Sequence, residues 1–154
     1  VVSASPMGLV NGGFESSYSG WTPTGNQQVT TGTSVTEGSK AIVFNSGQKT
    51  PNGVLTQTFA TVAGQSYTLA FDAGAFSLVN KGTQKLKVTV QGTALLLSQA
   101  VSVTAKGAGA KYSVRSFTFV ADRSTTTLTF QDQSATTTNI DLLLDNVRVT
   151  ARSK

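Results

Sequence analysis

Apolar and polar residues alternate with a period of two along most of the chain, and this pattern constrains the fold more than any other feature. In residues 66–75, alternate positions carry Tyr67, Leu69 and Phe71, which a β-strand places on one face. A helical repeat is hard to find anywhere. Gly, Asn and Ser separate the alternating runs at the spacing typical of all-β sandwiches. The pattern predicts an all-β protein of two antiparallel sheets.

Nine strands are expected from the alternation. They are residues 29–31, 41–45, 54–59, 66–75, 84–91, 95–103, 112–121, 125–131 and 140–150. Within 84–91 the pattern buries Leu86 and Val88 and turns Lys85 and Lys87 toward solvent. We expect one domain over residues 1–154, because a chain of this length can bury an ordinary core, with room for a disordered tail at 151–154.

The composition removes most catalytic chemistry. The sequence contains no cysteine and no histidine, so thiolate chemistry and the commonest general base and zinc ligand are absent. Seven carboxylates remain. Asp72 is expected to face outward on the predicted groove sheet, but no second carboxylate evidently joins it, as a glycosidase would require. The chain is therefore not expected to be an enzyme.

Charge and hydropathy limit the classes of partner that the protein is expected to bind. The formal charge is +5, but the basic residues are scattered, which favours a solvated surface over a nucleic-acid site and leaves an acidic glycan as an alternative. No window approaches the roughly 18 to 20 apolar residues of a membrane helix. We expect neither nucleic acid nor membrane as a partner.

Four blocks of sequence carry a family resemblance. They are LVNGGFESSYSGW at 9–21, GSKAIVF at 38–44, VAGQSYTLAFDAGA at 62–75, and SFTFVA…TTLTFQD followed by LLLDNVRV at 142–149. Together they resemble carbohydrate-binding modules of families 4, 9 and 22 and related extracellular domains with a galactose-binding-like jelly roll. The resemblance implies a secreted bacterial module, monomeric and attached to a glycoside hydrolase or lyase.

The resemblance also implies a structural calcium ion. Such modules often hold Ca²⁺ between the N-terminal segment and the last strand, and the matching positions here are Gly13, Glu15, Lys40 and Asp145. Calcium accepts main-chain oxygens, so few acidic residues are needed. The alternative is that Glu15 and Asp145 cap turns or pair with Lys40 and Arg148.

The resemblance also implies a sugar-binding face on one of the sheets. Family 4 modules line a groove with amide and basic side chains, and the matching outward positions are Gln57, Lys87 and Gln131, with Lys85 and Gln91 as neighbours. Aromatic rings that pack on sugars are expected at strand ends or loops. The stacking candidates are Tyr18, Phe76 and Tyr112, whereas Trp21 is expected to pack in the core. The alternative is that the polar positions are only the solvated face of a sheet.

The expected function is binding of a polysaccharide chain, either a β-glycan or an acidic polysaccharide, which would target an attached enzyme to it. Lys85 and Lys87 would pair with uronate or sulfate groups in the acidic case. Because the same fold carries adhesive and anchoring domains, a structural or adhesive surface domain that binds a protein, or no glycan, is the alternative.

Overall fold

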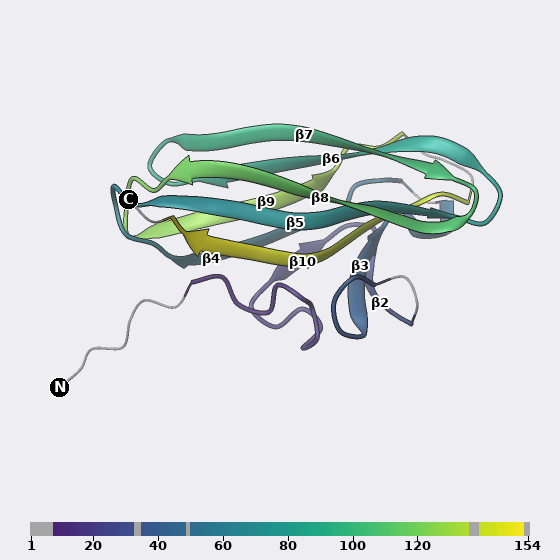
Figure 1. Cartoon of the computed structure of the whole chain (residues 1–154), viewed down its shortest axis with the longest axis horizontal. Helices are drawn as coiled ribbons and strands as arrows, with labels where there is room; N and C mark the ends of the chain where they lie inside the picture. Colours follow the sequence, from purple (N-terminus) through teal and green to yellow (C-terminus); the bar gives the residue numbers. More distant parts are fainter. Residues whose placement is uncertain (1–7, 33–34, 49, 136–138, 153–154) are drawn as a thin grey trace.

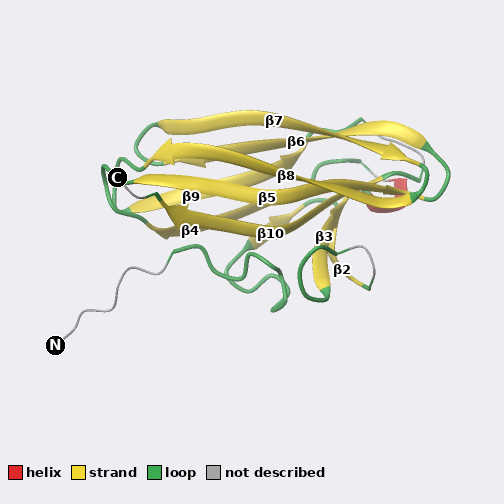
Figure 2. Ribbon diagram, in the orientation of Figure 1, coloured by secondary structure: helices red, strands yellow, loops and turns green. Residues whose placement is uncertain are grey.

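The computed structural model describes residues 8–32, 35–48, 50–135 and 139–152, and they form two packed antiparallel sheets (Figures 1 and 2). Sheet A has the strand order β1-β4-β9-β6-β7 and sheet B the order β2-β3-β10-β5-β8. The strands are β1 (Thr22–Thr24), β2 (Gln27–Thr31), β3 (Lys40–Phe44), β4 (Val54–Ala60), β5 (Ser66–Ser77), β6 (Lys81–Gln91), β7 (Leu95–Lys106), β8 (Gly109–Val120), β9 (Thr125–Asp132) and β10 (Asp141–Ala151), with a 3₁₀ turn η1 (Ser46–Gln48). The expected all-β sandwich is confirmed.

Each of the nine expected strands overlaps a strand of the structure, and only β1 was missed. This strand has three residues with Pro23 at its centre, too few for an alternating pattern. The tail expected from residue 151 is wrong at its start, because Ala151 pairs with Tyr67 and the Arg152 N–H donates to the Ser66 carbonyl at 2.9 Å. Residues 153 and 154 lie outside the described part of the chain.

Large apolar side chains from both sheets meet in one core. Phe71 of β5 and Phe130 of β9 are fully buried and meet edge to face, with ring centroids 5.1 Å apart. Leu86 and Val88 are also fully buried, as the alternation of β6 predicts. Among the described residues, no helix is long and apolar enough to cross a membrane.

The N-terminal segment, residues 8–21, closes one open side of the sandwich. Figure 1 shows it as the purple loop beside β4 and β10. Trp21 is only 6% exposed, and its ring centroid lies 5.3 Å from that of Phe14 and 6.3 Å from that of Phe130. Its indole N–H donates to the Asn11 carbonyl at 2.9 Å. Trp21 is therefore a core residue and is not available for stacking on a sugar.

Candidate functional site

One row of side chains crosses all five strands on the outer face of sheet B. Gln28, Val43, Leu143, Gly74 and Tyr112 are paired in register from β2 to β8. Neighbouring strands lie about 4.8 Å apart, so the row spans roughly 19 Å. A row of this length suits an extended ligand that lies across the strands.

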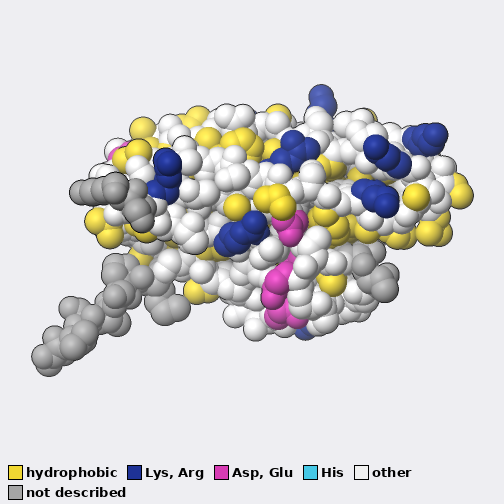
Figure 3. All heavy atoms as spheres, viewed as in Figure 1, with side chains coloured by type: hydrophobic (Ala, Val, Ile, Leu, Met, Phe, Trp, Pro, Cys, Tyr) yellow, Lys and Arg dark blue, Asp and Glu magenta, His cyan; other side chains and the backbone are white. Residues whose placement is uncertain are grey.

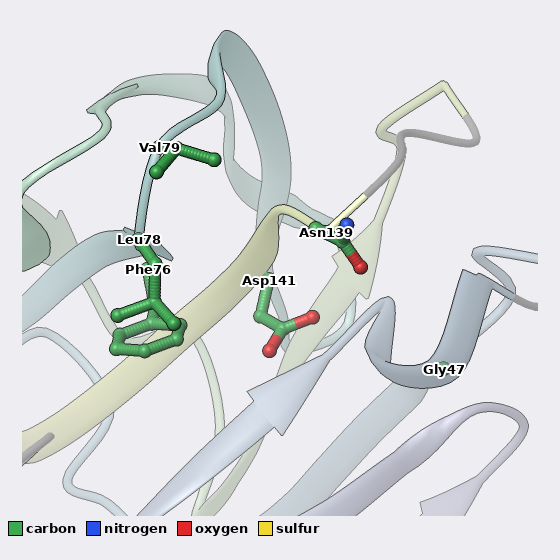
Figure 4. A pocket seen from close by; sticks show the side chains of 6 residues that line it. All are labelled: Gly47, Phe76, Leu78, Val79, Asn139 and Asp141. Atoms are coloured by element: carbon green, nitrogen blue, oxygen red, sulfur yellow. The ribbon is translucent and has the colours of Figure 1, made fainter.

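The part of the row on β2, β3 and β10 is the floor of a groove, which we call the sheet B groove; it consists of Gln28, Val43 and Leu143. The apolar floor residues Val43 and Leu143 are 5% and 1% exposed. Phe76 and Asp141 are paired one row further along the strands, and Figure 4 shows both side chains projecting toward the hollow. Two hollows share these two residues. The first, about 200 Å³, is also lined by Gln28, Thr30, Val43, Ser46 and Leu143, and the second, about 480 Å³, by Gly47, Leu78, Val79 and Asn139.

Gly74 leaves room for the neighbouring residues of β8. A Cβ atom at this position would lie 2.5 Å from the Lys111 carbonyl oxygen and 2.9 Å from Cγ and Cδ1 of Tyr112, distances at which the β8 backbone and the ring would have to move. The pKa of Tyr112 is raised by burial and, to a smaller degree, by the carboxylates of Asp145 and Asp72. The phenol therefore stays protonated and able to donate at physiological pH. Burial also raises the pKa of Asp141.

A buried carboxylate pair lies further along the same face. Asp72 and Asp145 are direct cross-strand partners and are 6% and 0% exposed. The Thr36 hydroxyl donates to Oδ2 of Asp72 at 2.6 Å, and Oδ2 of Asp145 accepts the N–H groups of Thr36 and Glu37 at 2.8 and 3.0 Å. Burial raises the pKa of Asp145 although these N–H donors oppose the shift. The loop that carries Thr36 therefore covers the pair, and Asp72 does not face open solvent.

The expected sugar-binding residues fall on opposite sides of the sandwich. Lys85, Lys87, Gln91 and Gln131 occupy outward positions on sheet A, where Lys87 and Gln131 are direct partners, whereas Phe76 and Tyr112 belong to sheet B. The aromatic side chains of the sheet A strands, Phe59 and Phe130, are both buried in the core. Sheet A thus offers amide, ammonium and hydroxyl groups but no ring, so the structure does not unite the expected site.

The outward orientation expected for Gln57 is wrong. The side chain is 4% exposed and faces inward on β4 between Leu55 and Phe59. Its Oε1 accepts the Val10 N–H at 2.8 Å, and its Nε2 donates to the Val10 carbonyl at 3.0 Å. A polar residue is tolerated there because the N-terminal segment satisfies both ends of the amide. Tyr18 also packs partly buried against the core.

The positions expected to hold calcium lie on two sides of one loop. Glu15 accepts the N–H groups of Ser39 and Lys40, both at 2.9 Å, and these donors lower its pKa. Asp145 accepts N–H groups from the same loop and at Oδ1 from Asn146, at 2.7 Å. Each oxygen of Glu15 accepts one N–H, as does Oδ1 of Asp145. The described residues contain no group of three or more His, Cys, Asp or Glu side chains that could hold a metal ion. Both carboxylates act here as loop caps, and calcium binding stays a prediction.

The sequence of β5 contains a signal for the sheet B groove that the alternation of apolar residues does not capture. Alternate residues of β5 opposite its core face are small or polar, Ala70, Asp72 and Gly74, and small side chains on an outer face leave room for a ligand. The groove also needs Gln28 and Asp141, from strands far apart in the sequence. Their proximity depends on strand order, which alternation alone does not give.

Comparisons with known proteins agree with this fold. The family model for proteins of unknown function DUF642 matches residues 9–150. The chain belongs to the DUF642 family. No match was found among curated protein sequences for this DUF642 protein.

Solved structures resemble the DUF642 protein in fold. The structure of TmCBM61 in complex with β-1,4-galactotriose has a TM-score of 0.70 at 17% identity, covering 94% of this chain and 97% of that chain. A family 35 carbohydrate-binding module from Clostridium thermocellum has a TM-score of 0.61 at 13% identity, covering 97% and 100%. The K1 cleaved adhesin domain of Lys-gingipain from Porphyromonas gingivalis W83 has a TM-score of 0.64 at 15% identity, covering 88% and 92%. Modules of families 16 and 4 also match, so the likeness extends over several families and does not single out the expected 4, 9 and 22 type.

Proposed function

We propose that this DUF642 protein is a non-catalytic carbohydrate-binding module and that a polysaccharide chain lies in the sheet B groove. The observation that carries the proposal is the groove itself, with an apolar floor of Val43 and Leu143 between Phe76, Asp141 and Gln28. Sugars present apolar ring faces and peripheral hydroxyls, so they suit a groove with one aromatic ring and a few convergent polar groups. The likeness to carbohydrate-binding modules of several families supports the same function.

The experiment is affinity electrophoresis and calorimetry on a panel of soluble polysaccharides. The panel includes β-1,4-galactan, because TmCBM61 was determined with β-1,4-galactotriose. We expect Phe76→Ala to weaken binding about tenfold, because it removes a stacking contact. Lys87→Ala and Gln131→Ala are the matched controls on sheet A. Loss of binding in these controls, with full binding by Phe76→Ala, would move the site to sheet A and contradict the proposal.

Several finer statements belong to the same proposal and rest on the sequence resemblance. The protein works outside the cell as a monomer, it targets an attached glycoside hydrolase or lyase to a polysaccharide, and it has no catalytic activity of its own. Sustained release of reducing sugar from any polysaccharide by the purified protein would contradict the last of these.

A second candidate function is adhesion to another protein. Leu78 and Val79 are 71% and 78% exposed beside the groove, and exposed apolar patches often mark protein interfaces. The likeness to the gingipain adhesin domain points the same way. Unchanged migration on the whole glycan panel would favour this candidate over the first.

A further inference from the structure

The basic residues are distributed unevenly in the fold. Between Asp72 and Asp122 the sequence has no acidic residue. The cations in this stretch are Lys81, Lys85, Lys87, Lys106, Lys111 and Arg115. All six lie on β6, β7 or β8, so this edge of the sandwich is strongly positive. Figure 3 shows dark-blue side chains gathered toward the end of the molecule where β7 and β8 are joined.

A pocket of about 600 Å³ lies on this basic edge, where β7 of sheet A meets β8 of sheet B. We call it the seam pocket. Its lining includes the cations Lys106, Lys111 and Arg115 and the hydroxyl residues Thr104 and Ser113, and no carboxylate of the described part of the chain lines it. A pocket with three cations and hydroxyl donors is suited to an anionic group.

Arg115 is held in position but retains donor capacity. Its Nη2 donates to the Ser102 carbonyl at 2.8 Å, which ties the edges of the two sheets together. Its Nε is buried and has no hydrogen-bond partner among the described residues. A guanidinium fixed in this way loses little conformational entropy when it binds a carboxylate or sulfate.

The lysines near the pocket also repel each other. Lys81 and Lys106 are direct cross-strand partners at the end of the β6–β7 ladder, and both are exposed. Like charges that face each other across a sheet are destabilising. An anion bound between them or beside them in the seam pocket would relieve this repulsion.

The seam pocket adjoins the outer row of sheet B at one residue. Tyr112 ends this cross-strand row on β8, and it also lines the seam pocket. A chain that extends from the sheet B groove along the row to β8 would therefore reach the basic edge. We propose that the seam pocket binds the carboxylate or sulfate groups of an acidic polysaccharide, an inference that rests on the proposed function.

The test compares polymers that share a backbone but differ in charge. Calorimetry would measure binding of polygalacturonate, of its carboxyl-reduced neutral form, which is a galactan, and of the sulfated derivative of this galactan, at about 20 mM and about 200 mM salt. We expect an acidic polymer to bind at least tenfold more tightly than the neutral one at low salt, with most of the difference lost at high salt. A preference for polygalacturonate identifies carboxylate as the bound group, and a preference for the sulfated galactan identifies sulfate.

Two double variants test whether the preference for acidic polymers depends on the seam pocket. Lys106→Gln/Lys111→Gln changes two exposed side chains and is expected to abolish the preference for the acidic polymer. Arg123→Gln/Arg152→Gln is the matched control, because it removes the same charge from two exposed residues away from the pocket. An equal effect of the two double variants, or equal binding of charged and neutral polymers, would overturn the inference.

The outcomes separate the inference from the proposed function. If the neutral polymer still binds the Lys106→Gln/Lys111→Gln variant but binds the Phe76→Ala variant more weakly, the groove is supported as the binding site. This holds whether or not the protein prefers acidic polymers. If the preference for acidic polymers depends on Lys106 and Lys111 while the Phe76→Ala variant binds fully, the seam pocket is supported and the groove is contradicted as the binding site.

Discussion

Replacement of Gln57 by leucine tests whether this residue holds the fold or binds a ligand. The amide makes two hydrogen bonds to Val10 from a position that is 4% exposed. Leucine is of similar size, so packing is retained while both hydrogen bonds are lost. At about 0.5–1.5 kcal/mol for each bond, we expect the free energy of unfolding to fall by about 2 kcal/mol.

The change in stability is large enough to measure by thermal unfolding. In a domain of this length, 1 kcal/mol corresponds to about 2–4 °C in Tm, so Gln57→Leu should melt roughly 4–8 °C below the parent protein. Gln57→Ala should melt lower still, because it adds a cavity. Circular dichroism and urea unfolding give these values, and calorimetry with a bound glycan should show unchanged affinity. A Tm within about 1 °C of the parent, with loss of glycan binding, would refute the reasoning and place Gln57 at the ligand.

Two further predictions concern buried carboxylates and calcium. Burial raises the pKa of Asp132, which is 3% exposed, and its Oδ2 has no hydrogen-bond partner among the described residues. Ionisation of Asp132 therefore lowers stability, fully above the folded-state pKa and progressively less as the pH falls from there to the unfolded-state pKa. Asp132→Asn should therefore stabilise the protein by about 1 kcal/mol at pH 7 and by much less near pH 4 in urea unfolding, and equal stability at pH 7 would count against the explanation. If calcium binds at Glu15 and Asp145, a chelator should lower Tm by several degrees, added calcium should restore it, and Asp145→Asn should remove the response. An identical melting curve with and without chelator would dismiss the calcium site.

The strands were predictable because each depends on local alternation. The inward Leu86 and Val88 and the outward Lys85 follow from the pleat of β6 alone. Gln57 was misplaced because a polar residue in an alternating strand normally faces solvent, and only the distant Val10 backbone makes its burial favourable.

The site was harder to predict because it depends on how the strands are ordered. Tyr112 and Phe76 are stacking candidates because of their positions at strand ends, but nothing in the local sequence predicts that they lie on the sheet opposite Lys87. The groove exists because β10 runs between β3 and β5. A pairing between strands roughly 70 to 100 residues apart leaves no short-range pattern in the sequence.

The N-terminal segment, residues 8–21, determines how far the protein can be truncated at its N-terminal end and still fold. The segment bonds to both sheets, through Gln57 of β4 and through the Val147 N–H of β10, which donates to Gly12 at 2.9 Å. It also supplies Phe14 and Trp21 to the interior. An expression fragment that starts at β1 would lack Phe14 and Trp21, would leave Phe130 with Phe71 but without Trp21, and would expose to water the side of the core that these two rings cover. Recombinant boundaries should therefore begin upstream of Leu9.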